Sequence, residues 1–283
     1  MNPSTSPQYQ QVVFKASHNS YDVKNETLAQ QLTFHPDAPA NCGCRGLELD
    51  IWRHSGGSIT VGAINSGFWT VNHLTNQGDD LSIYLAQLSD WHDANPQHDP
   101  VWVTIDVKSL IGSDDTFPEE LDNYLLTYFG RGLIMAIADL FPGFTGADGQ
   151  KLSEVAKADG WPTLAAMQGK FIFCISGDTD DWKKKYYQTD LPARLCLVDS
   201  KDPSELDHPN SRVVYNVESG KGKQNDFTTI QAANMLIRVY DADSSADWKK
   251  AATMGASILA TNAVAGSTWA CVGTAPFAER PTT

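Results

Sequence analysis

Residues 101–108 read VWVTIDVK, a run of β-branched and aromatic residues in which polar side chains alternate with apolar ones towards the end. A short run of this kind is typical of a strand that is buried in a sheet. Further runs of similar character are spread over the chain. They occupy residues 11–17, 45–52, 170–176, 194–200, 212–218, 236–242 and 256–262.

Helical patterns lie between these runs. Residues 81–95 carry Leu81, Leu85 and Leu88 on one helical face, and residues 118–129 repeat the pattern. Strands that alternate with helices along a chain favour a parallel sheet joined by crossover helices. Eight such strands predict an α/β fold of the TIM type, a closed (β/α)8 barrel.

The chain length suits one barrel of this kind. At 283 residues it matches a barrel built around one core, so we expect a single domain over residues 1–283. Two stretches depart from the regular pattern. Residues 58–63 (SITVGA) are expected to add a hairpin beside the mouth of the barrel, and residues 178–190 interrupt the alternation of strands and helices.

The charge balance argues against some classes of partner. With 21 Lys and Arg against 34 Asp and Glu, the formal net charge is −13, which disfavours nucleic-acid binding and docking on anionic lipid through a basic patch. No apolar run of about eighteen residues is present to span a membrane. The start, MNPSTSPQYQQ, lacks the basic and apolar segments of a secretory signal, and we expect an extracellular protein whose leader has been removed.

Carboxylates gather at the carboxyl ends of two predicted strands, the edge of a barrel where active sites lie. Glu48 and Asp50 are two residues apart, so both side chains point to the same face of the sheet. Asp106 ends the next barrel strand, two residues before Lys108. Like charges placed this way require a cation, a shared proton or a basic partner when they are partly buried. A surface pair of Asp106 and Lys108 is the simpler alternative for that strand.

Oxygen donors from three strands indicate a metal site. They suit Ca²⁺ or Mg²⁺ rather than metals that prefer thiolates. The candidate ligands are Asn19, Glu48, Asp50 and Asp106. Histidines are not needed as ligands, which leaves His18 and His73 for proton transfer, and a reference pKa near neutrality suits them to it. A lone histidine at the end of a strand is also compatible with a hydrogen-bonded core residue.

Several segments, in this order and spacing, resemble the catalytic X-region of phosphatidylinositol-specific phospholipases C, and most closely the bacterial calcium-dependent branch of the phospholipase C-like phosphodiesterases. Each motif is weak alone, but the ordered set covers nearly the whole predicted barrel. The segments are KASHNSYD at 15–22, CRGLELDIW at 44–52, TVNHLT at 70–75, VTIDVK at 103–108, GWPTLAAMQGKFIF at 160–173, RVYDAD at 238–243 and GASILATN at 255–262.

The resemblance implies a calcium site. Asn19, Glu48 and Asp50 match positions that ligate calcium in the family. Asp106 stands where the eukaryotic enzymes carry glutamate, and would ligate calcium or act as a base towards the inositol 2-hydroxyl. The exchange shortens the side chain by one methylene, so the resemblance supports Asp106 less firmly than the other ligands.

The resemblance also implies catalytic and substrate-binding roles. His18 would stabilise the phosphorane-like transition state or transfer a proton, and His73 would protonate the departing glycerol oxygen. Lys108 and Arg238 would lie within reach of the phosphate or the inositol ring. The implied reaction is cleavage of phosphatidylinositol, or a similar inositol phosphodiester, to a cyclic inositol phosphate and diacylglycerol.

The implied partners follow from that reaction. A phosphoinositide lipid or a small inositol phosphodiester would be the substrate, with transient contact with a membrane surface, and the protein would act as a monomer. One alternative is a glycerophosphodiester phosphodiesterase, but there an HRG run is normal where this chain has His18-Asn19-Ser20. The other alternative is a non-catalytic binding module on a barrel.

Overall fold

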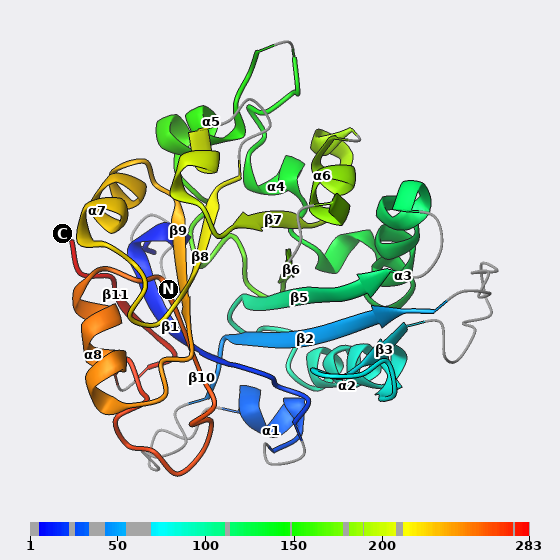
Figure 1. The fold of residues 1–283 in the computed structure, drawn as a ribbon, viewed down its shortest axis with the longest axis horizontal. Helices are drawn as coiled ribbons and strands as arrows, with labels where there is room; N and C mark the ends of the chain where they lie inside the picture. Colours follow the sequence, from blue (N-terminus) through cyan, green and yellow to red (C-terminus); the bar gives the residue numbers. More distant parts are fainter. Residues whose placement is uncertain are drawn as a thin grey trace.

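The structure is a computed structural model that describes residues 6–22, 26–33, 43–54, 69–110, 114–147, 149–177, 181–188, 190–207, 212–273 and 275–282. Within these ranges, eight parallel strands run side by side and close into a barrel with helices outside it (Figure 1). The strands are β1 (Val12–Ser17), β2 (Gly46–Arg53), β5 (Val101–Leu110), β6 (Phe171–Gly177), β7 (Leu197–Ser200), β8 (Val214–Glu218), β9 (Leu236–Tyr240) and β10 (Ile258–Thr261). Each of the eight predicted runs overlaps one of them, and β2, β5 and β6 extend one or two residues beyond their runs, so the predicted barrel is confirmed.

The barrel closes between β1 and β2, where two backbones approach closely. Ala16 of β1 pairs with Gly46 of β2, while β10 pairs along the other edge of β1. A Cβ atom added at Gly46 would lie 2.6 Å from the Cβ of Ala16. The closure therefore requires glycine at this position, because any side chain would push the two strands apart.

Helices cover the barrel as the apolar spacing indicated. The stretches predicted at 81–95 and 118–129 are the helices α2 and α3, and both pack on the sheet through buried leucines. The described helices are α1 (Leu28–Leu32), α2 (Leu81–Ala94), α3 (Phe117–Leu133), α4 (Ile137–Leu140), α5 (Leu152–Asp159), α6 (Asp181–Gln188), α7 (Gln224–Ala232) and α8 (Ser245–Thr253). Within the described ranges, none of them combines the length and the apolar character needed to cross a bilayer.

One expectation about the helices was wrong. Within the stretch 178–190, the described residues 181–188 form α6, which follows β6 as an ordinary crossover helix and so continues the alternation. Its many polar residues concealed it, since three consecutive lysines leave little apolar periodicity. Tyr186 and Lys183 are nevertheless buried on its inner side.

Three short strands extend the sheet beyond the barrel. β3 (Trp69–Val71) pairs antiparallel with β2, β4 (Asp79–Asp80) pairs with β3, and β11 (Phe277–Glu279) pairs antiparallel with β1. The hairpin expected at 58–63 lies outside the described residues. β3 leads directly into the loop that carries His73.

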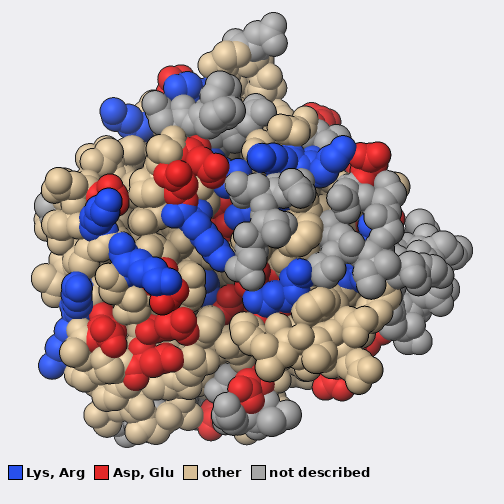
Figure 2. Space-filling model, in the orientation of Figure 1, with Lys and Arg blue, Asp and Glu red and all other residues tan. Residues whose placement is uncertain are grey.

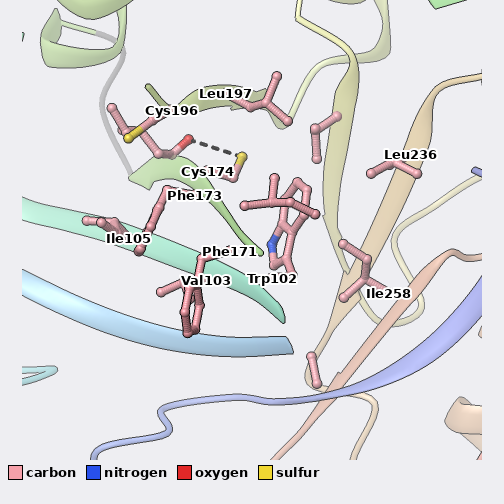
Figure 3. Close-up of a cluster of buried hydrophobic side chains, with 14 of the residues drawn as sticks. Trp102, Val103, Ile105, Phe171, Phe173, Cys174, Cys196, Leu197, Leu236 and Ile258 are labelled. Atoms are coloured by element: carbon pink, nitrogen blue, oxygen red, sulfur yellow. Dashed lines mark hydrogen bonds between the residues drawn. The ribbon is translucent and has the colours of Figure 1, made fainter. Parts of the chain in front are cut away.

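The buried core has two sides, because side chains alternate across each strand. Trp102, Cys174 and Ile258 point into the barrel, whereas Phe171 and Phe173 point towards the helices (Figure 3). All five are almost fully buried. The barrel interior is thus filled with side chains at its lower levels, and polar groups begin only near the carboxyl ends of the strands.

Candidate active site

Three carboxylates converge at the carboxyl end of the barrel. Glu48 and Asp50 come from β2 and Asp106 from β5, and Asp50 and Asp106 are direct partners across the two strands. One ligand oxygen from each of the three lies within 4.8 Å of the others, and all three residues are buried. Such spacing allows the three oxygens to share one ion, since Ca²⁺ binds oxygen at about 2.3–2.6 Å.

Two cations lie against this trio. Lys108 Nζ is 2.8 Å from Asp106 Oδ2 and 3.1 Å from Asp50 Oδ2. Arg238 Nη2, from β9, is 3.0 Å from Glu48 Oε2. The pair of Asp106 and Lys108 therefore exists, but it is buried in the site and not a surface pair.

The pKa values of the trio reflect burial and these partners. Burial, and next the charge of Asp50, raise the pKa of Asp106 to about 6 against the opposing effect of Lys108. Burial and the charge of Glu48 likewise raise the pKa of Asp50. For Glu48, burial acts upwards, but Arg238 and His18 outweigh it and lower the pKa. The ionised form of the two aspartates is thus destabilised, because the neighbouring cations do not fully offset the desolvation of their carboxylates.

The unpaired oxygens of the aspartates are the observation that fits a metal. Asp50 Oδ1 and Asp106 Oδ1 are both buried, and neither has a hydrogen-bond partner among the residues that the structure describes. Their Oδ2 atoms, in contrast, are each bound to Lys108. A buried carboxylate oxygen without a partner is costly, and a hard cation with oxygen ligands would satisfy both at once.

Asn19 and Tyr21 complete one side of the cluster. Asn19 has a left-handed backbone with φ 51°, and its amide N–H donates to Glu48 Oε2 at 3.2 Å. The Tyr21 hydroxyl is 3.0 Å from Asn19 Oδ1 and 2.9 Å from Asp50 Oδ2. A left-handed asparagine costs free energy, and it is a common feature of functional sites.

His18 and His73 flank the carboxylates from different elements. His18 follows β1, with Nε2 3.5 Å from Glu48 Oε2 and Nδ1 3.0 Å from Asp241 Oδ1. His73 lies in the loop after β3, with Nδ1 2.8 Å from Asp50 Oδ2, and half of its side chain (52%) is exposed. One nitrogen of His73 is thereby held by the cluster, while the ring itself faces the mouth of the barrel.

The structure thus joins every predicted site residue in one network of contacts. They are His18, Asn19, Glu48, Asp50, His73, Asp106, Lys108 and Arg238.

The sequence profile of the family described as "Phosphoinositide phospholipase C, Ca2+-dependent" matches residues 71–269, well over half of the chain. The chain belongs to this family. It is therefore a phosphoric diester hydrolase that acts on phosphatidylinositol and depends on calcium. The two alternatives, a glycerophosphodiester phosphodiesterase and a non-catalytic module, are not favoured. No curated protein matches the chain in sequence.

Solved structures of calcium-dependent phospholipases C share the fold. The phosphoinositol-specific enzyme from Pseudomonas sp. aligns with a TM-score of 0.77 at 18% identity, over 99% of this chain and 97% of that one. The phosphatidylinositol-specific enzyme of Streptomyces antibioticus aligns with a TM-score of 0.67 at 19% identity, over 91% of this chain and 95% of that one. At these identities the likeness supports the barrel and not the role of any residue.

Several polar groups around the site of this phospholipase C were not assigned a role from the sequence. Asp241 accepts from His18, and Asn262 Nδ2 lies 3.1 Å from the same nitrogen, His18 Nδ1. Asp243 in turn accepts from the backbone and side-chain amides of Asn262. Asp241 and Asp243 follow β9 directly, so the rule that placed Glu48 and Asp106 at strand ends would have found them.

Asp241 changes the protonation of His18. Burial by itself lowers the pKa of His18, but the hydrogen bond to Asp241 and the charge of Glu48 outweigh it, so that the pKa is raised. The hydrogen bond to His18 correspondingly lowers the pKa of Asp241. His18 is therefore a cation over more of the neutral range than a free histidine would be.

Proposed function

We propose that this chain, as a single catalytic domain over residues 1–283, cleaves phosphatidylinositol by attack of the inositol 2-hydroxyl on phosphorus. The products are a cyclic inositol phosphate and diacylglycerol. The observation that carries the proposal is the buried carboxylate trio with two unpaired oxygens, flanked by two histidines that come from different elements.

The proposed calcium ligands are Asn19, Glu48, Asp50 and Asp106. Within the described residues, the Oδ1 atoms of the two aspartates accept no hydrogen bond, which supports their assignment. Bound calcium would supply charge neutralisation at a phosphate oxygen and a lower pKa for the 2-hydroxyl. The remaining chemistry falls to side chains of the chain itself.

Lys108 and Arg238 are proposed to orient the carboxylates among these ligands. Lys108 contacts one oxygen on each of the two aspartates, and Arg238 contacts one oxygen of Glu48. Partners of this kind orient metal ligands and are often as important as the ligands. Their positive charges would also attract the substrate phosphate, the role that the family resemblance implies.

His18 and Asp106 are proposed to serve the attacking side. His18, whose pKa is raised by the hydrogen bond to Asp241 and the charge of Glu48, would in its protonated form stabilise the negative charge that develops on the phosphoryl group. Asp106, whose carboxylate lies in the trio beside the proposed ion, is proposed to accept the proton of the 2-hydroxyl. General acid–base steps of this kind typically contribute about 10²–10⁴-fold each.

His73 is proposed as the acid on the leaving side. Its Nδ1 is engaged by Asp50, which fixes the ring and leaves Nε2 to donate to the glycerol oxygen. The exposed position of His73 agrees with a leaving group that extends out of the barrel into lipid.

Transient membrane contact is proposed at Leu74, which follows His73. Leu74 is 79% exposed, the largest exposure among the described large apolar residues, and its backbone N–H donates to Asn72 Oδ1 in a tight turn. Lys and Arg side chains are interspersed with Asp and Glu on the face drawn in Figure 2. With a net charge of −13, apolar insertion is a better means of lipid contact than a basic patch.

Five aromatic side chains are less suitable than Leu74 for membrane insertion. Trp69, Tyr186 and Tyr187 are buried, and Trp182 and Trp269 pack against the core.

The cysteines and the net charge bear on the location and the partners of the protein. Cys271 is disulfide-bonded, and disulfides persist in oxidising compartments, which supports an extracellular location. The acidic charge argues against nucleic-acid partners. We propose a monomer with an inositol-containing substrate, and the Pseudomonas relative is known in a complex with myoinositol.

Product analysis tests the proposal directly. Purified protein is incubated with phosphatidylinositol vesicles and calcium, and the water-soluble products are followed by ³¹P NMR. A cyclic inositol phosphate should appear, and excess chelator should abolish it. Phosphatidic acid with free inositol would instead indicate a diesterase that cleaves on the inositol side, and glycerophosphoinositol would indicate removal of the acyl chains. Calcium binding without turnover would indicate a binding module.

A further inference from the structure

A buried polar chain leads from the carboxylate trio across the barrel. Arg238 and Asn216 face each other across β9 and β8, and both are almost fully buried. Arg238 Nη1 donates to Asn216 Oδ1 at 2.9 Å, while Arg238 Nη2 lies 3.0 Å from Glu48 Oε2. Arg238 thus bridges a proposed calcium ligand and an amide on the opposite wall.

The chain of polar contacts continues beyond Asn216. Its Nδ2 donates to Asp199 Oδ2 at 2.6 Å and to Ser176 Oγ at 3.1 Å. The other oxygen of Asp199 lies 3.4 Å from Nζ of Lys183, which is buried on the inner side of α6. Four contacts in series therefore connect Glu48 to Lys183 through the interior.

The amide of Asn216 can adopt only one orientation in this chain. Arg238 has donors and no acceptor, and an ionised Asp199 has acceptors and no donor. The amide oxygen must therefore face Arg238 and the amide nitrogen must face Asp199. Reversing the amide would place two donors together on one side and two acceptors on the other, which is costly in a buried site.

The guanidinium of Arg238 depends on this amide for its direction. Among the described residues, Nε and Nη2 of Arg238 make no well-aligned hydrogen bond, and the contact with Glu48 is an ion pair. The bond to Asn216 is therefore the directional contact that sets the plane of the guanidinium. That guanidinium lies closer to Glu48 Oε2 than the two other groups around this oxygen, the Asn19 backbone N–H and His18 Nε2.

We propose that Asn216 and Asp199 are positioning residues for catalysis: they hold Arg238 so that Glu48 is oriented towards calcium. The inference rests on the proposed function, in which Glu48 is a ligand. It goes beyond the proposed function by giving β7 and β8, which reach Glu48 through Arg238, a role in calcium affinity.

The first test replaces the amide by an apolar group of similar size. Asn216→Leu should weaken calcium binding, measured by calorimetry without substrate, by roughly tenfold, the lower end of the range for outer partners of metal ligands. Thr104→Val is the matched control, because Thr104 is equally buried in the barrel and accepts a hydrogen bond from Trp102. Its calcium affinity should stay within about twofold of the wild type.

The second test exchanges the polarity of the pair and keeps the total charge. In Asn216→Asp two carboxylates face each other, and in Asp199→Asn an amide faces an amide. The double variant restores a complete set of hydrogen bonds, because a carboxylate at 216 accepts from Arg238 and from an amide at 199. Each single variant should lose calcium affinity, and the double variant should recover to within about threefold of the wild type.

The outcomes separate this inference from the proposed function. A wild-type protein that binds no calcium would overturn the proposed function itself. A wild type that binds calcium, with Asn216→Leu binding equally well, would overturn only the role of Asn216. If Asn216→Leu does not fold, the polarity exchange decides: a folded double variant without recovery of affinity contradicts the inference. If calcium affinity falls in step with thermal stability in every variant, Thr104→Val included, the chain of polar contacts has only a structural role.

Discussion

His18 Nδ1 and Asp241 Oδ1 lie 3.0 Å apart, although 222 residues separate them in the sequence and they follow different strands, β1 and β9. Asp241 has a left-handed backbone (φ 56°), an unfavourable conformation for a residue other than glycine. This conformation turns the carboxylate towards the imidazole. The pair is therefore built at some cost, and its effect is to keep His18 protonated.

Replacing the carboxylate by an amide tests that pair. Asp241→Asn keeps the size of the side chain but removes the charge, so the pKa of His18 should fall. The alkaline limb of the pH–rate profile should move to lower pH, and turnover near pH 7.5 should drop by roughly tenfold or more. NMR titration of His18 supplies the direct measurement. An unchanged His18 pKa would show that Glu48, and not Asp241, sets its charge.

Calcium should be required for both turnover and full stability. At a free calcium concentration of about 100 times Kd, binding should stabilise the fold by about 2.7 kcal/mol. Differential scanning calorimetry with and without calcium measures this, and Asp106→Asn should reduce the gain. Mg²⁺ should substitute poorly, because it demands a tighter octahedral site. Full activity in excess chelator would mean that Lys108 and Arg238 suffice without a metal.

The acid role of His73 is tested with two substrates. His73→Ala should lose roughly 10²-fold or more in turnover on phosphatidylinositol. The loss should be much smaller on a nitrophenyl inositol phosphate, whose leaving group is already a stable anion and needs no proton. His18→Ala is the comparison, since it should be severe on both substrates. Equal losses for His73→Ala on both would remove His73 from the acid role.

Leu74 should matter more on vesicles than on a dissolved substrate. Burying part of a leucine side chain in lipid is worth about 1 kcal/mol, or roughly fivefold in binding. Leu74→Ser should therefore weaken binding to phosphatidylinositol vesicles, measured by co-sedimentation, by about that factor. Ile83→Ser is the control, because Ile83 is also exposed but lies on α2. Equal effects of the two substitutions would argue against a specific insertion at the mouth.

A histidine pair far from the active site predicts a pH dependence of stability. His92 Nδ1 lies 3.0 Å from His98 Nε2, and the other nitrogen of His98 lies 2.6 Å from the Asp99 carbonyl oxygen. Burial lowers the pKa of His98, the backbone bond to Asp99 opposes this, and His92 and Arg45 lower it further.

The sign follows from that direction. As pH falls, His98 takes up a proton in the unfolded chain, with a pKa of about 6.5, before it does so in the folded protein. The stability contributed by neutral His98 is therefore complete above about pH 6.5 and is lost as pH falls through the lower folded pKa. Urea unfolding at pH 7.5 and 5.0 should show this decline. His98→Gln should be less stable at pH 7.5 but less sensitive to pH, and an equally steep decline in the variant would assign the effect to other groups.

Much of the fold was predictable because strand periodicity is local. The eight runs were visible as short apolar segments, and the period of two placed Glu48 and Asp50 on one face without any structure. The helix α6 was missed because its inner side rests on few residues, among them Lys183 and Tyr186, and its exposed lysines dominate the pattern.

The features of the site likewise divide into positions along a strand, which are local, and contacts between strands, which are not. The sequence by itself determined which strands end in carboxylates and histidines, since that depends only on spacing along each strand. Only the closed barrel decided that Asp241 meets His18, that Lys108 faces two aspartates, and that Asn216 stands between Arg238 and Asp199. These contacts depend on the stagger of neighbouring strands and on side-chain geometry across the interior, and no pattern within a single strand encodes them.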